Sequence, residues 1–216
     1  MKKSYAYLLF DWDGMIARTL DPWFDAKVAI TKKYGVNASD EEIVASFGHF
    51  LHYCRDVWRF DNPEKVYKEM SDAARVGIAK TSTYTGAVET LSGLHRAGKT
   101  LALVTTSPKH NLDALIDRLG LRSIFDVILT GEDVAKHKPH PQSLEKAFAA
   151  LGATDKSKTI MIGDSGNDIE AAANFGCDSI LFYPPEHKKF YRLDELTSHN
   201  PTYVVTDFRD IAGIVN

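Results

Sequence analysis

The amino-acid sequence predicts an α/β fold built on a doubly wound parallel β-sheet. From residue 86 onward, short apolar runs alternate with amphipathic stretches. Apolar runs bounded by turn residues are typical of buried strands, and apolar residues three or four apart are typical of helices. Alternation of the two requires helical crossovers, which produce a parallel sheet. Residues 22–84, in contrast, show helical patterns and no convincing strand, which predicts an all-helical insertion.

The expected strands are short and apolar. The first covers residues 7–10 and ends at the sequence Asp11-Trp12-Asp13-Gly14. Because ligands of open parallel sheets bind at the carboxyl ends of the strands, the residues that follow each strand are candidates for function. The later strands are expected at residues 100–105, 127–129, 159–162, 179–182 and 203–205.

Helices are expected within the insertion and between the later strands. In the insertion, one helix covers residues 22–34, and a second begins at Ser39 with Glu42 in the capping-box position. Residues 184–201 are expected to form the only long irregular segment. The helices between the strands are expected at residues 88–97, 110–119, 141–151, 168–175 and 208–214.

The composition indicates an ordinary globular protein. With 216 residues and 44% hydrophobic content, the chain can form a core of residues 1–19 and 85–216 that carries an insertion at residues 20–84. The formal net charge is −3 and charges of both signs are mixed, so we expect neither nucleic acid nor a membrane as a partner. Cys54 and Cys177 lack cysteine neighbours, which favours free thiols in the cytoplasm. The sequence does not indicate an oligomeric state.

The two carboxylates after the first strand form the starting point of a candidate site. Side chains alternate along an extended segment, so Asp11 and Asp13 point the same way and Trp12 points the other way. Two like charges so close together require a cation, a proton or a hydrogen-bond network. Taken alone, the same residues also fit an ordinary turn.

A cluster of hydroxyl residues follows the second strand. Thr105, Thr106 and Ser107 stand at the start of a helix, where free backbone N–H groups favour an anion. The alternative is structural, with Ser107 acting as the N-cap of that helix.

Further charged residues belong to the same edge of the predicted sheet. Asp164 and Asp168 follow the fourth strand, and Lys138 lies in a basic segment that opens a helix. Together with Asp11 and Asp13, they provide carboxylate ligands for Mg²⁺, a cation for a phosphate and a free carboxylate that can attack phosphorus. We therefore expect metal-assisted phosphoryl chemistry.

These residues resemble a known set of four motifs. Asp11-Trp12-Asp13-Gly14, Thr105, Lys138-Pro139 and the segment from Gly163-Asp164 to Asp168 are similar, in type and order, to the motifs of the haloacid dehalogenase-like hydrolase superfamily. The helical insertion resembles the small cap of its phosphoglycolate phosphatase-like branch. The resemblance implies a Rossmann-like core with a helical cap inserted after the first strand. It also implies a cytoplasmic, Mg²⁺-dependent phosphatase whose substrate is a small phosphorylated metabolite, either phosphoglycolate-like or a sugar phosphate.

The same resemblance implies a role for each motif residue. Asp11 would be the nucleophile that becomes an aspartyl-phosphate, and Asp13 would act first as general acid and then as general base. Thr105, Thr106 and Lys138 would bind the phosphoryl group. The metal site would consist of the Asp11, Asp164 and Asp168 carboxylates and the backbone carbonyl of Asp13.

Some residues depart from the motifs or lie beside them. Met15 and Arg18 stand where the family usually has threonine and aspartate, which puts the turn geometry and the rate in question. His137 and His140 flank Lys138, but Mg²⁺ prefers oxygen ligands, so we expect neither to bind metal. Four basic residues of the insertion recur at helical spacing and either read the remote end of the substrate or form a solvated helix face: His49, His52, Arg55 and Arg59.

Two other functions use the same residues. A sugar phosphomutase would return the phosphoryl group of the same aspartyl-phosphate to the substrate instead of transferring it to water. A non-catalytic binding or regulatory protein on this fold would have lost its chemistry, and Met15 keeps this alternative open. A dehalogenase is disfavoured because that branch lacks an acidic residue at the position of Asp13.

Overall fold

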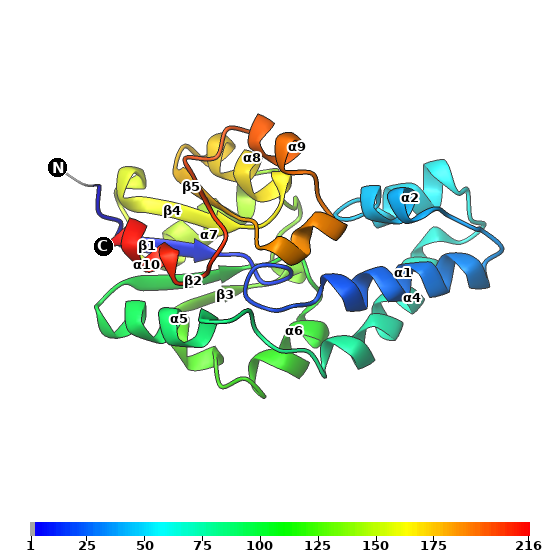
Figure 1. The fold of residues 1–216 in the computed structure, drawn as a ribbon, viewed down its shortest axis with the longest axis horizontal. Coiled ribbons are helices and arrows are strands. Elements are labelled where there is room, and N and C mark those ends of the chain that lie inside the picture. Colours follow the sequence, from blue (N-terminus) through cyan, green and yellow to red (C-terminus); the bar gives the residue numbers. More distant parts are fainter. Residues whose placement is uncertain (1–2) are drawn as a thin grey trace. The chain divides into compact units, whose positions relative to one another are not determined.

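A six-stranded parallel β-sheet forms the centre of the computed structural model, which describes residues 3–216. The first two residues of the expected core segment, Met1 and Lys2, lie outside the described residues, as does the side chain of Ala114. The strand order is β3-β2-β1-β4-β5-β6. The strands are β1 (Tyr7–Phe10), β2 (Thr100–Val104), β3 (Val127–Leu129), β4 (Thr159–Gly163), β5 (Asp178–Phe182) and β6 (Tyr203–Val205), shown in Figure 1.

Strand β1 lies at the centre of the sheet, between β2 and β4. Tyr7 is aligned with Thr100 on one side and with Thr159 on the other, so the three strands end side by side. The order of the strands reverses direction at β1, and this is the point where open α/β sheets bind their ligands. The sheet thus brings the residues that follow β1, β2 and β4 to one edge.

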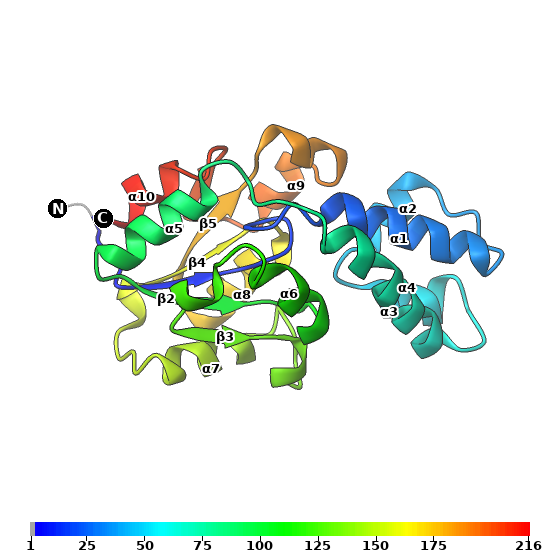
Figure 2. The ribbon, with the colours of Figure 1, turned by 90° about the horizontal axis from the view of Figure 1, so that it is seen from below.

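Helices cover both faces of the sheet. On one face, α7 and α8 pack through Leu144, Ala147 and Phe175 against Leu9 and Met161 of the strands. On the other face, the Phe10 ring of β1 stacks on Phe208, with ring centroids 6.4 Å apart. Figure 2 shows α5 and α10 on the side of the strands opposite α7. The core helices are α5 (Ala87–Arg96), α6 (Lys109–Ile116), α7 (Gln142–Ala150), α8 (Gly166–Phe175), α9 (Leu193–Ser198) and α10 (Asp210–Val215).

This architecture confirms the predicted fold class. The strands at residues 127–129 and 203–205 have the expected bounds, and the predicted helices are found within a few residues of their expected ends. The prediction of an irregular segment at residues 184–201 is wrong, because this segment contains the short 3₁₀ helix η5 (Pro185–Lys189) and helix α9. Leu196 of α9 packs with Ile169 and Leu181, so tertiary burial stabilises a helix that the charge-rich sequence conceals.

The chain divides into two compact units, one of Met1–Arg18 with Ser82–Asn216 and one of Thr19–Thr81. The smaller unit is helical, and its second helix begins with the expected capping box between Ser39 and Glu42. Among the described residues, no helix is both long and apolar enough to cross a lipid bilayer. The helices of the smaller unit are α1 (Leu20–Lys33), α2 (Asp40–Ala45), α3 (Phe50–His52), the π-helical turn η1 (Tyr53–Val57) and α4 (Pro63–Ile78).

Candidate active site

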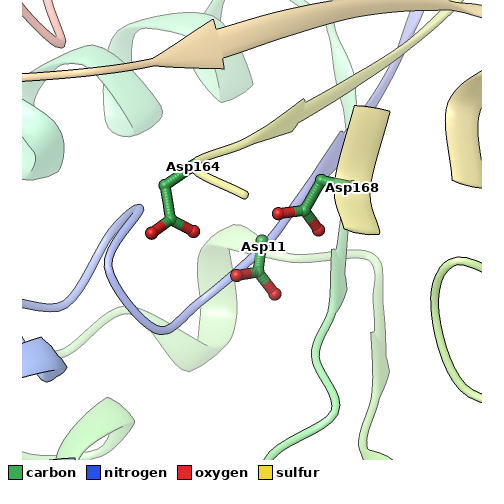
Figure 3. Close-up of side chains that lie close together, drawn as sticks. All are labelled: Asp11, Asp164 and Asp168. Atoms are coloured by element: carbon green, nitrogen blue, oxygen red, sulfur yellow. The ribbon is translucent and has the colours of Figure 1, made fainter. Parts of the chain in front are cut away.

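Three carboxylates converge at the carboxyl edge of the sheet, as Figure 3 shows. Asp11 follows β1, Asp164 follows β4, and Asp168 lies in the first turn of α8; one oxygen of each lies within 4.8 Å of one oxygen of the others. The side chains of all three residues are buried. Oδ2 of Asp164 is buried, and no residue that the structure describes gives it a hydrogen bond. Carboxylates in this arrangement fit a hard cation, because each contributes an oxygen ligand and the buried Asp164 oxygen has no hydrogen-bond donor among the described residues.

Close packing at Gly163 brings Asp168 against the end of β4. A Cβ atom at this position would lie 2.3 Å from Cγ of Asp168, so only glycine fits here. Oδ2 of Asp168 accepts hydrogen bonds from the Ser165 hydroxyl at 2.7 Å and the Ser165 amide at 3.1 Å, which makes Asp168 the capping-box residue of α8. The helix start and the site therefore share one carboxylate.

Lys138 bridges two of the three carboxylates. Its Nζ donates to Oδ1 of Asp11 and to Oδ1 of Asp168, both at 2.6 Å, and to the carbonyl of Val104 at 3.0 Å. Burial opposes the charge of Lys138, but the two carboxylates raise the pKa of its ammonium above the usual value. An ammonium hydrogen-bonded to this degree has a fixed position, which a group that must hold a nucleophile requires.

The carboxylates outnumber the cation, and their pKa values reflect this. The pKa of Asp11 is raised to about 7, mainly by burial. The Lys138 charge opposes this rise, and the Asp168 and Asp13 charges add to it. Burial, together with the Asp11 and Asp168 charges, also raises the pKa of Asp164 well above its usual range. A bound divalent cation would lower both values, so the electrostatics of the site favour a metal ion.

Asp13 lies beside hydroxyl groups from the β2 end. The Ser107 hydroxyl donates to Oδ2 of Asp13, and the Thr105 hydroxyl lies 3.5 Å from the same oxygen. Ser107 N–H donates to Oγ1 of Thr105 at 3.0 Å, which orients that hydroxyl. Trp12, between the two aspartates, is buried in the core, as expected for an extended segment.

The structural alternative, in which Ser107 caps α6, is wrong. Pro108 occupies the N-cap position, and its ring has no acceptor that could cap the helix. The Ser107 hydroxyl is directed to Asp13. Ser107 is therefore a site residue that sequence reasoning assigned to a structural role; its place in the hydroxyl cluster was the available signal. The α6 N-terminus already has an anion, since Lys109 N–H donates to Oε2 of Glu132 at 2.9 Å. Thr106 is exposed.

The four basic residues of the smaller unit do not form a regular helical stripe. His49 precedes α3, His52 is the last residue of α3, and Arg55 lies in η1. Arg59 lies beyond these helical turns and has a φ angle of 52°. The expected helical spacing is wrong for Arg59 because the chain leaves the helix after η1. His52 pairs with Asp56 at 2.7 Å, and Arg55 pairs with Glu64. All four side chains are exposed.

The residues that depart from the motifs or flank Lys138 lie outside the carboxylate cluster. Met15 is fully buried, so it contributes to packing in the loop that follows β1. Arg18 pairs with Glu186 at 2.7 Å. His137 and His140 are exposed, and in residues 3–216 the group suited to a metal consists of the three aspartates without either histidine.

Comparisons with known proteins identify the family of this chain. The sequence profile of the haloacid dehalogenase-like hydrolase family matches residues 8–182. A pyrophosphatase, PpaX of Anoxybacillus flavithermus, is 31% identical over 78% of this chain and 79% of its own length. A phosphoglycolate phosphatase of Salmonella typhi is 32% identical over 92% of this chain and 72% of its own length. The chain belongs to the haloacid dehalogenase-like hydrolase family, and it is an enzyme with the phosphatase type of activity for which these relatives are named.

Solved structures share the fold. A variant of CbbY from Rhodobacter sphaeroides, in complex with xylulose-(1,5)bisphosphate, has a TM-score of 0.80 and 22% identity over 95% of this chain and 96% of that chain. A chain from Thermotoga maritima assigned as a β-phosphoglucomutase has a TM-score of 0.73 and 20% identity over 100% of this chain and 98% of that chain. At these identities the likeness concerns the fold alone.

Proposed function

We propose that the protein is a Mg²⁺-dependent phosphatase that hydrolyses a small phosphorylated metabolite through an aspartyl-phosphate on Asp11. The observation that carries this proposal is the Lys138 ammonium, 2.6 Å from both Asp11 and Asp168, beside a buried Asp164 oxygen without a partner. An anionic nucleophile approaches an anionic phosphate only where positive charge is fixed beside both. Lys138 supplies part of this charge, and the three carboxylates supply the ligands for the rest.

In the first step, a carboxylate oxygen of Asp11 attacks phosphorus and the bond from phosphorus to the leaving oxygen breaks. Asp13 donates its proton to that oxygen. In the second step, Asp13 takes a proton from water, the water oxygen bonds to phosphorus, and the bond to Asp11 breaks to release inorganic phosphate. Thr105 and Ser107, both within hydrogen-bond reach of Asp13, would orient its carboxyl group and a phosphoryl oxygen.

The donor set fits Mg²⁺, which prefers oxygen ligands. Asp11 and Asp164 would hold the ion through their carboxylates, with the Asp13 carbonyl as expected from the family. Asp168 would join them or act through Lys138, since both of its oxygens already accept hydrogen bonds. When bound, the ion would neutralise negative charge on the phosphate and the carboxylates.

The named relatives and the two free cysteines support a substrate class and a location. The relatives named for phosphoglycolate and pyrophosphate hydrolysis favour a small phosphorylated metabolite. The exposed basic residues His49, His52, Arg55 and Arg59 are retained as candidates for reading its remote end. Free Cys54 and Cys177 are consistent with a reducing cytoplasm.

The test is hydrolysis of p-nitrophenyl phosphate and of a panel containing phosphoglycolate, pyrophosphate and sugar phosphates, with and without Mg²⁺. Asp11→Asn should reduce kcat at least ~10³-fold, because the amide keeps the size of the side chain but loses its nucleophilicity. The matched control is Asp117→Asn, an exposed residue paired with Arg122, which should retain the parent rate. Near-parental activity of Asp11→Asn at saturating Mg²⁺ would exclude the covalent mechanism.

A sugar phosphomutase is the second candidate, favoured by the fold of the Thermotoga maritima chain assigned as a β-phosphoglucomutase. Incubation of a sugar phosphate with its bisphosphate separates the two functions: a mutase yields the isomeric sugar phosphate, and a phosphatase yields free phosphate. A regulatory protein would give neither product and would leave p-nitrophenyl phosphate intact.

A further inference from the structure

A fully buried histidine lies outside the carboxylate cluster, in the segment that follows β5. His187 of η5 is 0% exposed and is enclosed by aromatic side chains. The ring centroids of Tyr84, Phe182, Tyr183 and Tyr191 lie 5.5, 5.8, 6.1 and 5.8 Å from that of His187. A buried imidazole costs free energy unless it is neutral and hydrogen-bonded, so its partners indicate what it does.

The main partner of His187 is a tyrosine hydroxyl. Nε2 of His187 and Oη of Tyr84 are 2.7 Å apart. The other ring nitrogen, Nδ1, is buried without a hydrogen-bond partner among the described residues. The backbone of Gly14 acts on the His187 ring and raises its pKa, against the effect of burial. Burial lowers the pKa of His187 to about 4, so the ring is neutral at neutral pH. The histidine thus contacts both Tyr84 and the loop that carries Asp13.

Tyr84 is itself bonded to that loop. Residues 12–17 form a compact turn after β1, and Asp13 lies within it. The hydrogen bonds that hold the turn and join it to Tyr84 are Ile16 N–H to Trp12 O at 3.0 Å, Ala17 N–H to Trp12 O at 3.0 Å, Gly14 N–H to Ala17 O at 2.9 Å and Tyr84 N–H to Ile16 O at 3.0 Å. A displacement of Tyr84 therefore reaches the Asp13 backbone through one hydrogen bond and one tight turn.

A second contact joins the same segments. Glu186, the neighbour of His187, pairs with Arg18 at 2.7 Å, and the Arg18 guanidinium lies 5.2 Å from the centre of the Tyr84 ring. This ion pair is exposed, so its contribution to stability is small. The buried hydrogen bond between His187 and Tyr84 is the stronger constraint, because an unpaired partner in that environment would be costly.

We propose that His187 is a positioning residue for Asp13, acting through the Tyr84 hydroxyl to hold the turn of residues 12–17 in place. This inference rests on the proposed function, from which Asp13 takes its role as acid and base. Proton transfer depends steeply on the distance between donor and acceptor, so a turn that shifts by a fraction of an ångström lowers the rate. Lys138 and the carboxylates of Asp11, Asp164 and Asp168 lie outside this turn, so substrate binding through them depends on it less than proton transfer by Asp13 does.

The experiment compares His187→Phe and Tyr84→Phe with the parent. Each change removes one partner of the hydrogen bond between His187 and Tyr84, and each keeps an aromatic ring among the side chains that enclose His187. Both variants should lower kcat for p-nitrophenyl phosphate about tenfold while KM changes less than twofold. The matched control is Tyr203→Phe, which removes the hydroxyl that lies 3.3 Å from the Tyr5 hydroxyl at the opposite edge of the sheet, and it should keep the parent kcat.

Amide hydrogen exchange provides a readout that does not require activity. In both variants, peptides covering residues 12–17 should exchange faster than in the parent, whereas peptides of β4 should not change. Unchanged exchange in residues 12–17, a uniform increase that includes β4, or a parental kcat in a folded variant would each overturn the proposal. Tyr84→Phe alone decides the matter if His187→Phe does not fold. If the parent itself is inactive toward every phosphate ester, the proposed function fails, and with it the assigned role of Asp13, whatever the exchange of the turn.

Discussion

The two units of the chain each contain a buried lysine, and the two lysines differ in their partners and in the direction in which their pKa values shift. Lys138 of the larger unit is 8% exposed and donates to two carboxylates, which raise its pKa. Lys27 of the smaller unit is 4% exposed, and its Nζ lies 3.8 Å from the centre of the Phe47 ring and 3.4 Å from Oγ of Ser46. Burial lowers the pKa of Lys27 to about 7, an effect that the nearby Cys54 only partly offsets.

This difference teaches that burial alone does not identify a functional cation. Burial penalises an ammonium in both units, and the sign of the pKa shift depends on whether carboxylates are close enough to compensate. Around Lys138 the charges form a network that phosphoryl chemistry requires. Around Lys27 the neighbours are aromatic rings and a hydroxyl, which stabilise a cation only weakly.

The largest effect is expected for Lys138→Met. This change leaves the buried Asp11 and Asp168 charges without their cation, and removing one partner of a buried ion pair typically costs about 3–5 kcal/mol. We expect the free energy of unfolding, measured by urea denaturation without added metal, to fall by about 3 kcal/mol at pH 7.5. The rate of p-nitrophenyl phosphate hydrolysis should fall at least ~10²-fold. Parental stability in this variant would contradict the view that the two carboxylates and Lys138 compensate one another.

Lys27→Met should act in the opposite direction. The folded-state pKa of about 7 lies below the unfolded value of 10.5, so the unfolded chain binds more protons between these two pH values and stability rises with pH across them. Methionine has a similar length and no charge, so it should stabilise the protein at pH 6.5, and the gain should shrink toward pH 10. Urea denaturation at pH 6.5 and 9.5 measures this. A gain independent of pH would point to packing instead of the lysine charge.

The smallest effect is expected for Arg55→Gln. The Arg55–Glu64 pair has the same chemistry as a buried ion pair, but its side chains are 51% and 61% exposed. Water and salt screen exposed pairs, so the unfolding temperature of the variant should match that of the parent. The same variant tests the cap hypothesis, since a substrate-reading Arg55 would raise KM for the natural substrate while leaving kcat unchanged. Thermal unfolding and KM together separate the two roles.

The sequence by itself determined the fold class and the set of residues that meet at the sheet edge. Periodicity is a local property, so short apolar runs and helical spacing identified the strands and most helices within a few residues. Parallel strands end at a common edge, so the positions of Asp11, Asp164 and Asp168 after their strands were enough to predict that they converge. Periodicity did not predict helix α9, because its short, charged sequence is stabilised by packing against residues that are distant in the sequence.

Only the tertiary structure decided what each side chain does within that frame. Lys138 and Asp11 are 127 positions apart in the sequence, and His187 and Tyr84 are 103 apart, so no local pattern links either pair. The structure directs the Ser107 hydroxyl to Asp13 instead of to the helix start, and it buries Lys27 with no carboxylate partner in residues 3–216. Burial and charge compensation depend on the atoms that folding brings within a few ångströms, and these contacts are properties of the packed chain, not of residue spacing.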